Sequence, residues 1–423
     1  MFYKIYLWIK DGKNRLWVKP ALGSIFAIAF ALFATLTDKF FPPDLLPSIK
    51  EETINTALNA ISTSMLSVTT FSLAVMVSSL SSVASGATPR ATELVMADDN
   101  TQNAISAFIS AFIYAVIAQI ALGLGYYGPS GRFVLFIATV LVLLYLIYSL
   151  IVWVKTLSTL GRMGNTLGKL EDAATEAMLI YRRAPRMGAG PGLLLPEESV
   201  AVNADRVGHV RYIDMGALQS YAAEVGARLH IRVRQGVQVY PGSVLVRCES
   251  PSEPDHDRIR DAFIIGKART YRQDPRYGIV VLSEVAQRAL SPAVNDPGTA
   301  IAVMNTITRI LIDARPPSGD DQEEPHDYDR LTMIGLDEND FITQGFDPIS
   351  RDGAAIFEVH MRMQKMLAAI GRSGSVTLAP AARRQAARAL QRAEATDMLE
   401  QEKTAVRQAF ESLHGTAGNG ADF

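Results

Sequence analysis

Hydroxyl-bearing side chains recur at intervals of three or four residues along one apolar stretch, residues 57–85. The series consists of Thr63, Ser67, Thr70, Ala74, Ser78, Ser81 and Ser85, in which only Ala74 lacks a hydroxyl. This spacing keeps the side chains on one face of an α-helix. Such a face allows close helix packing, with hydroxyls bonded to backbone carbonyls four residues back, or it lines a wet path across a membrane. The sequence leaves both interpretations open.

A single arginine follows this stretch, in Ser85-Gly-Ala-Thr-Pro-Arg90. Thr88 before Pro89 predicts a helix cap and a short amphipathic helix that runs through Met96. Arg90 then either meets lipid headgroups or Glu93, or contributes to a ring of charge at the cytosolic mouth of a pore.

A second group of polar residues surrounds three proline pairs, Asp274-Pro275, Ser291-Pro292 and Asp296-Pro297. Each pair places a capping oxygen before a proline at the first helical position, so we expect three helix starts within about 25 residues. Helix N-termini also attract anions, and nearby arginines would add charge. The candidates for a cytosolic ligand or gate group are Arg269, Thr270, Asp274, Arg288, Ser291, Asn295 and Asp296.

Other kinds of chemistry have weak support. We find no nucleophile elbow, no P-loop and no cluster of metal ligands, and the six histidines have no ligand spacing. We therefore expect no catalytic residue, metal or cofactor, and no enzyme activity. Cys248 ends an apolar run and is expected to be structural. The formal net charge of −2 disfavours a nucleic-acid partner.

The elements that position these residues are expected to be membrane helices. Of the 423 residues, 48% are hydrophobic, and four segments are long enough to cross a bilayer core, which needs about twenty residues. They are residues 17–36, 57–85, 104–127 and 133–154. Lysines and Arg15 precede the first segment, which places the N-terminus in the cytoplasm, and four crossings return the chain there. No charged residue lies in the interior of these segments, which argues against an intramembrane proton relay.

The remaining chain is expected to be a cytosolic α+β region. After the transmembrane domain 1–155, we predict a helical extension and Gly/Pro linker (156–192) and a small β-rich module (193–252). A helical domain (253–372) with an acidic loop (314–330) and a C-terminal helix and tail (373–423) follow. The glycine spacing in the β-rich module resembles the barrel-sandwich fold of lipoyl and biotinyl domains, but the lysine turn that those domains modify is missing.

Several motifs together resemble one bacterial family. They are the Ser-rich second segment that closes in Ser-Gly-Ala-Thr-Pro-Arg90, residues 103–114, Arg269-Thr, residues 273–278, and Arg288-Ala-Leu-Ser-Pro-Ala-Val-Asn-Asp-Pro297. The family is the predicted membrane protein family catalogued as domain of unknown function 2254. The resemblance covers residues from about Lys19 to about Ile370. It implies a polytopic inner-membrane protein with a cytosolic domain, and it brings no established activity.

Two functions follow from these patterns. The first is a homo-oligomeric channel or passive pore for inorganic ions, lined by the second segment and gated by the cytosolic region. The second is a membrane-anchored sensor or scaffold whose cytosolic domain binds a small anionic ligand or a protein. Both place the protein in the lipid bilayer of the bacterial inner membrane, with its N- and C-termini in the cytoplasm.

Overall fold

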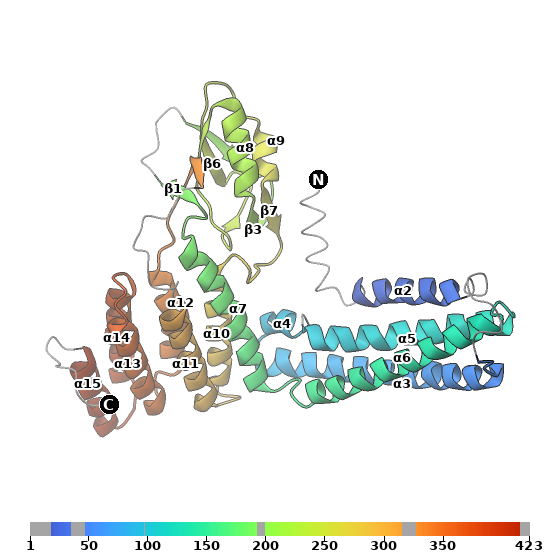
Figure 1. Cartoon of the computed structure of the whole chain (residues 1–423). Coiled ribbons are helices and arrows are strands. Elements are labelled where there is room, and N and C mark those ends of the chain that lie inside the picture. Colours follow the sequence, from blue (N-terminus) through green and yellow to red (C-terminus); the bar gives the residue numbers. More distant parts are fainter. Residues whose placement is uncertain (1–17, 35–46, 97, 193–198, 315–326, 415–423) are drawn as a thin grey trace. The chain divides into compact units, whose positions relative to one another are not determined.

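The computed structural model describes residues 18–34, 47–96, 98–192, 199–314 and 327–414 (Figure 1). Contacts between residues divide the chain into two compact units. The first unit runs to Thr166 without Gly86–Thr88, and the second consists of Gly86–Thr88 and the chain from Leu167 onward. Both β-sheets belong to the second unit.

Long apolar helices build the first unit. Its elements are α2 (Val18–Ala34), α3 (Glu51–Gly86), the 3-10 helix η2 (Pro89–Ala91), α4 (Thr92–Met96), α5 (Asp99–Gly123) and α6 (Pro129–Leu157). Three of these helices, α3, α5 and α6, are long and apolar enough to cross a membrane. The short helices η2 and α4 lie where the Thr88-Pro89 pair predicted an amphipathic helix through Met96.

The expected fourth span is not confirmed. Helix α2 has 17 residues, and its apolar stretch is the shorter segment Pro20–Ala29. At about 1.5 Å per residue, the described part of α2 reaches about 26 Å, against a bilayer core of about 30 Å. Both ends of the predicted segment 17–36, residue 17 and residues 35–36, lie outside the described residues.

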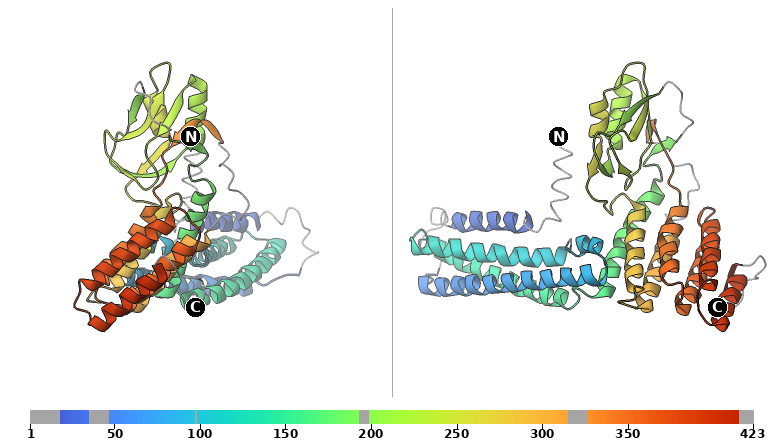
Figure 2. Two further views of the ribbon diagram at one scale, coloured as in Figure 1. Left: turned by 90° about the vertical axis from the view of Figure 1, so that its left-hand side faces the viewer. Right: turned by 180° about the vertical axis from the view of Figure 1, so that it is seen from behind.

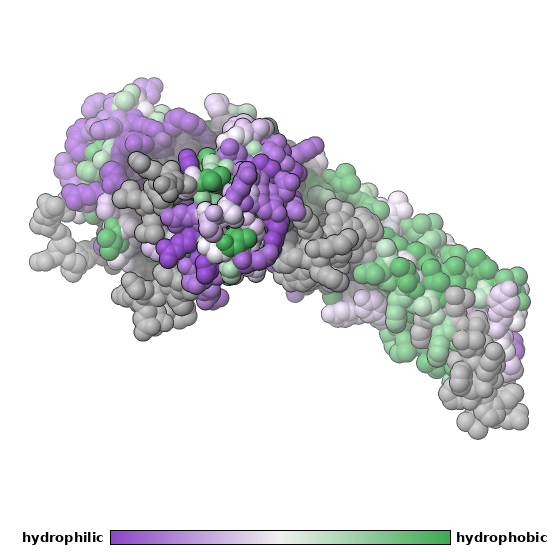
Figure 3. Space-filling view, turned by 90° about the horizontal axis from the view of Figure 1, so that it is seen from above, coloured by the Kyte–Doolittle hydropathy of each residue, from purple (hydrophilic) through white to green (hydrophobic). Residues whose placement is uncertain are grey.

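Large side chains fill the centre of the first unit. Phe108 on α5 and Leu135 on α6 are fully buried, as are Ile54 and Leu58 on α3. Buried polar groups pair across the same core: the Tyr114 hydroxyl lies 3.1 Å from Thr139 Oγ1, and Thr139 donates to its own helix. The outer surface is apolar, and Figure 3 shows hydrophobic residues gathered over these helices.

Two sheets form the β part of the second unit. Their strands are β1 (Ala189–Pro191), β2 (Val200–Asn203), β3 (Gly208–Ile213), β4 (Arg228–Ile231), β5 (Gln238–Val239), β6 (Val244–Glu249), β7 (Phe263–Gly266) and β8 (Tyr328–Met333). The five-stranded sheet has the order β1-β8-β4-β6-β2, and the three-stranded sheet has the order β5-β3-β7. Helices α8 (Met215–Val225) and α9 (His256–Asp261) pack with them around buried Leu218, Leu229 and Val246.

This arrangement differs from the expected barrel-sandwich module. Strand β8 pairs in parallel with both β1 and β4, whereas the other pairs are antiparallel, so the larger sheet is mixed. Strands β7 and β8 come from beyond residue 252, and α8 interrupts the strands of the expected module. The pairing of Leu229 with Leu331 joins positions about 100 residues apart, which glycine spacing within one segment does not predict.

Successive helices build the rest of the second unit. They are α7 (Met163–Arg183), α10 (Pro275–Ala289), α11 (Pro297–Asp313), α12 (Asn339–Asp352), α13 (Phe357–Arg372), α14 (Leu378–Glu394) and α15 (Glu400–His414). Helices α10 to α15 pack against one another, as both views of Figure 2 show. Helix α11 buries one apolar face, which includes Ala300, Val303, Met304, Ile307 and Ile310.

The single C-terminal helix predicted within residues 373–423 is two helices, α14 and α15. Helix α14 ends at Glu394, and the Thr396 hydroxyl donates to the carbonyl of Ala393 at 2.7 Å. Threonine side chains that bond to nearby backbone in this way compete with continuation of a helix. Most of the predicted acidic loop, residues 315–326, and the tail from 415 lie outside the described residues.

Candidate functional site

The predicted hydroxyl series lies on one exposed face of α3. All seven residues, Thr63, Ser67, Thr70, Ala74, Ser78, Ser81 and Ser85, are exposed in the chain taken alone. With about 100° between successive residues, they fall within an arc of about 80°. The opposite face is buried and includes Ile54, Leu58, Met65 and Val83.

Three hydroxyls on this face donate hydrogen bonds to backbone carbonyls of their own helix. Ser67 donates to the Thr63 carbonyl at 3.2 Å, and Thr70 donates to the Leu66 carbonyl at 3.0 Å. Ser85 donates to a carbonyl three residues back at 3.1 Å. A hydroxyl used in this way keeps oxygen lone pairs that can accept further bonds. The face therefore presents acceptor oxygens to whatever covers it.

Large apolar side chains border the hydroxyl face. Leu66, Leu73 and Val77 lie along one side of the arc and Phe71 along the other, and all four are exposed. The face thus has a small, polar centre and bulky, apolar edges. Beyond its end, Arg90 is exposed within η2.

The cytosolic candidates fall into two groups, of which the first surrounds the start of α10. Asp274 caps this helix by accepting from the backbone N–H of Arg276 at 3.2 Å. Two nitrogens of Arg269 reach the same carboxylate oxygen, Nε at 2.7 Å and Nη2 at 2.6 Å. Burial raises the pKa of the Asp274 carboxyl, and the charge of Arg269 opposes that effect. Thr270 beside them is partly buried.

A glycine brings the β part against this carboxylate. Gly236 has φ +82°, and a Cβ added there would lie 1.8 Å from Asp274 Oδ2. Next to it, buried Arg234 donates to the carbonyls of Ile334 at 2.8 Å and Pro185 at 2.6 Å. These contacts identify the first group as a joint between the sheets and α10, with the capping carboxylate already paired to Arg269.

The second group lies at the other end of α10. Asp296 caps α11 by accepting from the backbone N–H of Thr299 at 3.0 Å and from its hydroxyl at 2.6 Å, and the hydroxyl bond lowers the pKa of Asp296. Arg288 and Asn295 are exposed, and Asn295 has φ +50°.

One predicted cap in this group is wrong. No helix begins at Pro292, because the residues after Ser291 form a turn, and the Ser291 hydroxyl donates to the Arg288 carbonyl at 2.7 Å. The two other predicted caps, Asp274 and Asp296, are confirmed. Fourteen helical positions separate Asp274 from Arg288, about 21 Å along the axis, so the seven candidates do not form one pocket.

The part of the chain that the structure describes contains no group of three or more His, Cys, Asp or Glu residues placed to hold a metal ion. Cys248 is buried on β6, as expected of a structural cysteine, and burial raises the pKa of its thiol.

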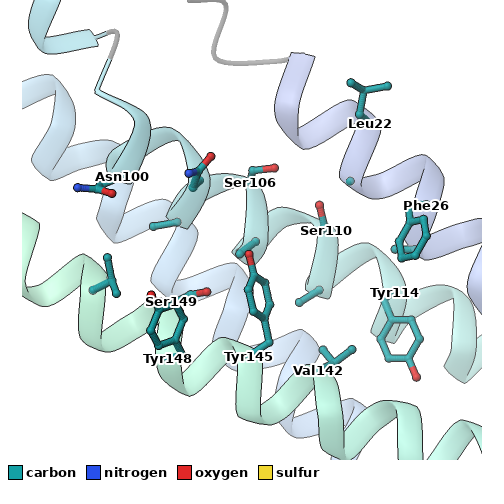
Figure 4. Close-up of a pocket in the computed structure, with 17 residues that line it drawn as sticks. Leu22, Phe26, Asn100, Ser106, Ser110, Tyr114, Val142, Tyr145, Tyr148 and Ser149 are labelled. Atoms are coloured by element: carbon teal, nitrogen blue, oxygen red, sulfur yellow. The ribbon is translucent and has the colours of Figure 1, made fainter. Parts of the chain in front are cut away.

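A cavity of about 700 Å³, which no sequence pattern predicted, lies between α2, α5 and α6. Figure 4 shows Asn100, Ser106, Ser110 and Tyr114 of α5 around it, with Tyr148 and other residues of α6. The spacing of polar residues on α5 is three or four, the same signal that pointed to α3. Most of these positions fall in the family motif at residues 103–114, where alanines between them make the segment apolar as a whole and hide the polar face.

The family described as "Predicted membrane protein (DUF2254)" matches residues 13–369 of this chain. The chain belongs to this family. The DUF2254 chain is also similar to uncharacterized proteins of Mycobacterium tuberculosis (strain CDC 1551 / Oshkosh) and Mycobacterium bovis, at 31% identity over 122 residues. Those matches cover 27% of this chain and 23% of each relative, so the chain spans less than a quarter of their length in the match. No solved structure matches it.

Proposed function

We propose that this DUF2254 protein forms a homo-oligomeric channel or passive pore in the bacterial inner membrane. In this proposal α3 helices from several copies surround a central path, and the second unit forms a cytosolic vestibule or gate. The observation that carries it is the exposed hydroxyl face of α3. A polar face directed away from the rest of its own unit needs either water or another copy of the helix as its neighbour.

The shape of that face supports a shared axis. Small side chains at its centre leave space, and Leu66, Leu73 and Phe71 at its edges provide apolar contact with adjacent copies. Helix α3 has 36 residues, or about 54 Å at 1.5 Å per residue, against a bilayer core of about 30 Å. The helix therefore extends past the core, and the exposed Arg90 follows as a residue of the cytosolic mouth.

The bonding of the hydroxyls favours one class of permeant species. Because Ser67 and Thr70 donate their hydrogens to their own helix, their free lone pairs coordinate cations or accept hydrogen bonds from water. The seven lining positions carry no formal charge. The lining alone therefore favours water and inorganic cations, whereas a ring of Arg90 at the mouth opposes the entry of cations, so we expect weak charge selectivity overall.

The proposed orientation places both termini in the cytoplasm. The basic residues before α2 and those after α6, such as Lys155 and Arg162, follow the positive-inside rule. This orientation requires α2 to cross the membrane together with the three long helices.

The alternative function is a membrane-anchored sensor that binds a small anionic ligand or a protein through the second unit. It would draw on Arg269, which precedes the start of α10, and on Arg288 in the last turn of that helix. Arg269 is already paired with Asp274. We favour the pore because its residues share one continuous face.

Cysteine accessibility in the full-length protein, reconstituted into planar bilayers, tests the pore. The natural Cys248 is buried, so single cysteines can be added without removing it. We expect Ser67→Cys and Ser78→Cys to conduct and to be blocked by a cationic methanethiosulfonate reagent. The matched control is Ser64→Cys, which is also exposed on α3 but lies about 80° from the centre of the hydroxyl face. The current through the Ser64→Cys variant should persist after the reagent is added.

Two results would overturn the pore. One is a reconstituted protein that stays silent in sodium, potassium and chloride salts at every pH and voltage polarity tested. The other is equal block at Ser64→Cys and Ser78→Cys, which would remove the hydroxyl face as the lining.

A further inference from the structure

The cavity between α2, α5 and α6 is distinct from the hydroxyl face of α3. None of the described residues that line it belongs to α3. Helix α2 approaches α5 closely beside it, because Gly23 has no side chain: a Cβ there would lie 2.3 Å from Ser110 Oγ. Because the two helices are close at Gly23, α2 forms one wall of the cavity and α5 and α6 form the others.

One wall of the cavity is polar. Asn100, Asn103, Ser106, Ser110 and Tyr114 follow α5 at intervals of three or four, which places them on the same face. Ser110 Oγ is shielded from solvent and has no hydrogen-bond partner among the described residues. Buried polar groups are normally paired, so an unpaired hydroxyl at the edge of a cavity calls for a partner within that cavity.

The remaining walls are apolar and aromatic. Among the described residues around the cavity none is charged, and the apolar ones include Val142, Val152 and alanines of α5. Leu22 and Phe26 of α2 are exposed, as is Tyr148 of α6. Figure 4 shows Phe26 and Tyr148 on opposite sides of the cavity. In a membrane-spanning unit, exposed side chains of this kind face acyl chains, so a ligand would enter from the bilayer.

The dimensions fit an elongated molecule. From Asn100 to Tyr114 the polar wall covers fourteen helical positions, or about 21 Å. The volume of about 700 Å³ lies within the range of about 300–1,000 Å³ that is usual for small-molecule sites. Hydrogen-bonding groups are spread over several levels of this wall, so a ligand with several oxygen atoms can bond to it at more than one level.

We infer that this cavity binds an uncharged glycerolipid of the diacylglycerol type. Its hydroxyl and ester oxygens bond to Asn103, Ser106 and Ser110, and one acyl chain lies between Phe26 and Val142. The described lining contains no charged side chain that could pair with a phosphate headgroup. The polar wall offers an uncharged head hydrogen bonds that the hydrocarbon core of the bilayer does not offer. The inference does not depend on the pore.

Photo-crosslinking tests the site in the full-length protein, held in phosphatidylcholine nanodiscs. The probe is diacylglycerol with a diazirine on one acyl chain, and the labelled peptides are mapped by mass spectrometry. We expect labelling on α5 and α6 peptides that line the cavity. Ser106→Phe fills the cavity and should lower the yield at least about fivefold, whereas the control Leu141→Phe, exposed on α6 and not part of the lining, should not change it.

A second variant keeps the size of the side chain. Asn103→Leu removes hydrogen bonds from an exposed lining residue, and the loss of one bond corresponds to about a fivefold lower affinity. This variant carries the test if Ser106→Phe does not fold, as judged by gel filtration and thermal unfolding. Equal labelling of Asn103→Leu and Leu141→Phe would overturn the site.

The head chemistry is tested with two further probes. Diazirine-bearing phosphatidylglycerol, which is anionic, should label the cavity peptides at least about fivefold less than the diacylglycerol probe. A diazirine-bearing quinone should also label weakly. Stronger labelling by either probe than by diacylglycerol would overturn the assignment of an uncharged glycerolipid.

Discussion

The stability of α13 should fall as the pH falls, because this helix buries an uncharged histidine. His360 is fully buried, and Ser350, Gln364 and Gln385 are buried in the same helical layer. Burial lowers the pKa of His360 to about 4 from an ordinary value of 6.5, and the charge of Arg392 acts in the same direction. A histidine of this kind stays neutral in the folded state at a pH where it would be protonated in the unfolded state.

The sign and size of the effect follow from the difference in bound protons. At about pH 5 an exposed histidine with a pKa of 6.5 is about 97% protonated, whereas His360 in the fold is about one-tenth protonated. The unfolded state therefore binds more protons, and the free energy of unfolding decreases as the pH decreases. Between about pH 7.5 and about pH 5 the expected loss is about 2 kcal/mol. His414, whose pKa is also lowered by burial, adds to the loss.

Hydrogen exchange of the full-length protein measures this effect locally. The opening free energy of peptides from α13, corrected for the intrinsic pH dependence of exchange, should fall by about 2 kcal/mol or more in the wild type. His360→Leu removes the titrating group and should remove most of that fall. The control His256→Leu alters a partly exposed histidine on α9, and the fall in the opening free energy of α13 should remain in this variant. A wild-type value independent of pH, or an undiminished fall in His360→Leu, would refute the reasoning.

Two further predictions concern glycines at close approaches, each with a glycine control and each measured by thermal unfolding and hydrogen exchange. Gly236→Ala combines φ +82° with a Cβ 1.8 Å from the carboxylate that caps α10, and it should lower the free energy of unfolding by at least about 2 kcal/mol. Its control Gly242→Ala, with φ +93° and open space around the Cβ, should lower the free energy of unfolding by about 1 kcal/mol. Gly278→Ala would place a Cβ 2.4 Å from that of Ala174 and should loosen α10 from α7, whereas Gly168→Ala, with open space on α7, should stabilise its helix by about 0.5–1 kcal/mol.

Periodicity predicted the local features of this protein well. The spacing of three or four in residues 57–85 identified a single face of α3, and the structure places all seven residues on its exposed side. Asp274 and Asp296 cap helices, as their proline pairs indicated. These features depend on neighbours within one or two turns, so short stretches of sequence contain their physical cause.

Features that depend on residues distant in the chain could not be predicted from short sequence patterns. Strand β8 completes the larger sheet by pairing with β4, and no short pattern in either strand specifies that partner. Ser291-Pro292 has the residue types of a helix start, but its serine donates to the end of α10 and the chain turns. The contact of Gly236 with Asp274 joins segments whose local sequences give different signals, a glycine turn and a helix cap.

The two polar faces of the membrane unit differ in the partner that each requires. The hydroxyls of α3 lie on the outside of the unit and donate to their own helix, so a second copy or a column of water can cover them. The hydroxyl of Ser110 lies at a cavity that three helices of one copy line, so a small molecule suffices there. Disulfide cross-linking of Ser67→Cys between copies should therefore persist when Ser106→Phe fills the cavity. If filling the cavity abolished that cross-link, the two faces would be coupled, and the lipid would have to be treated as part of the oligomer.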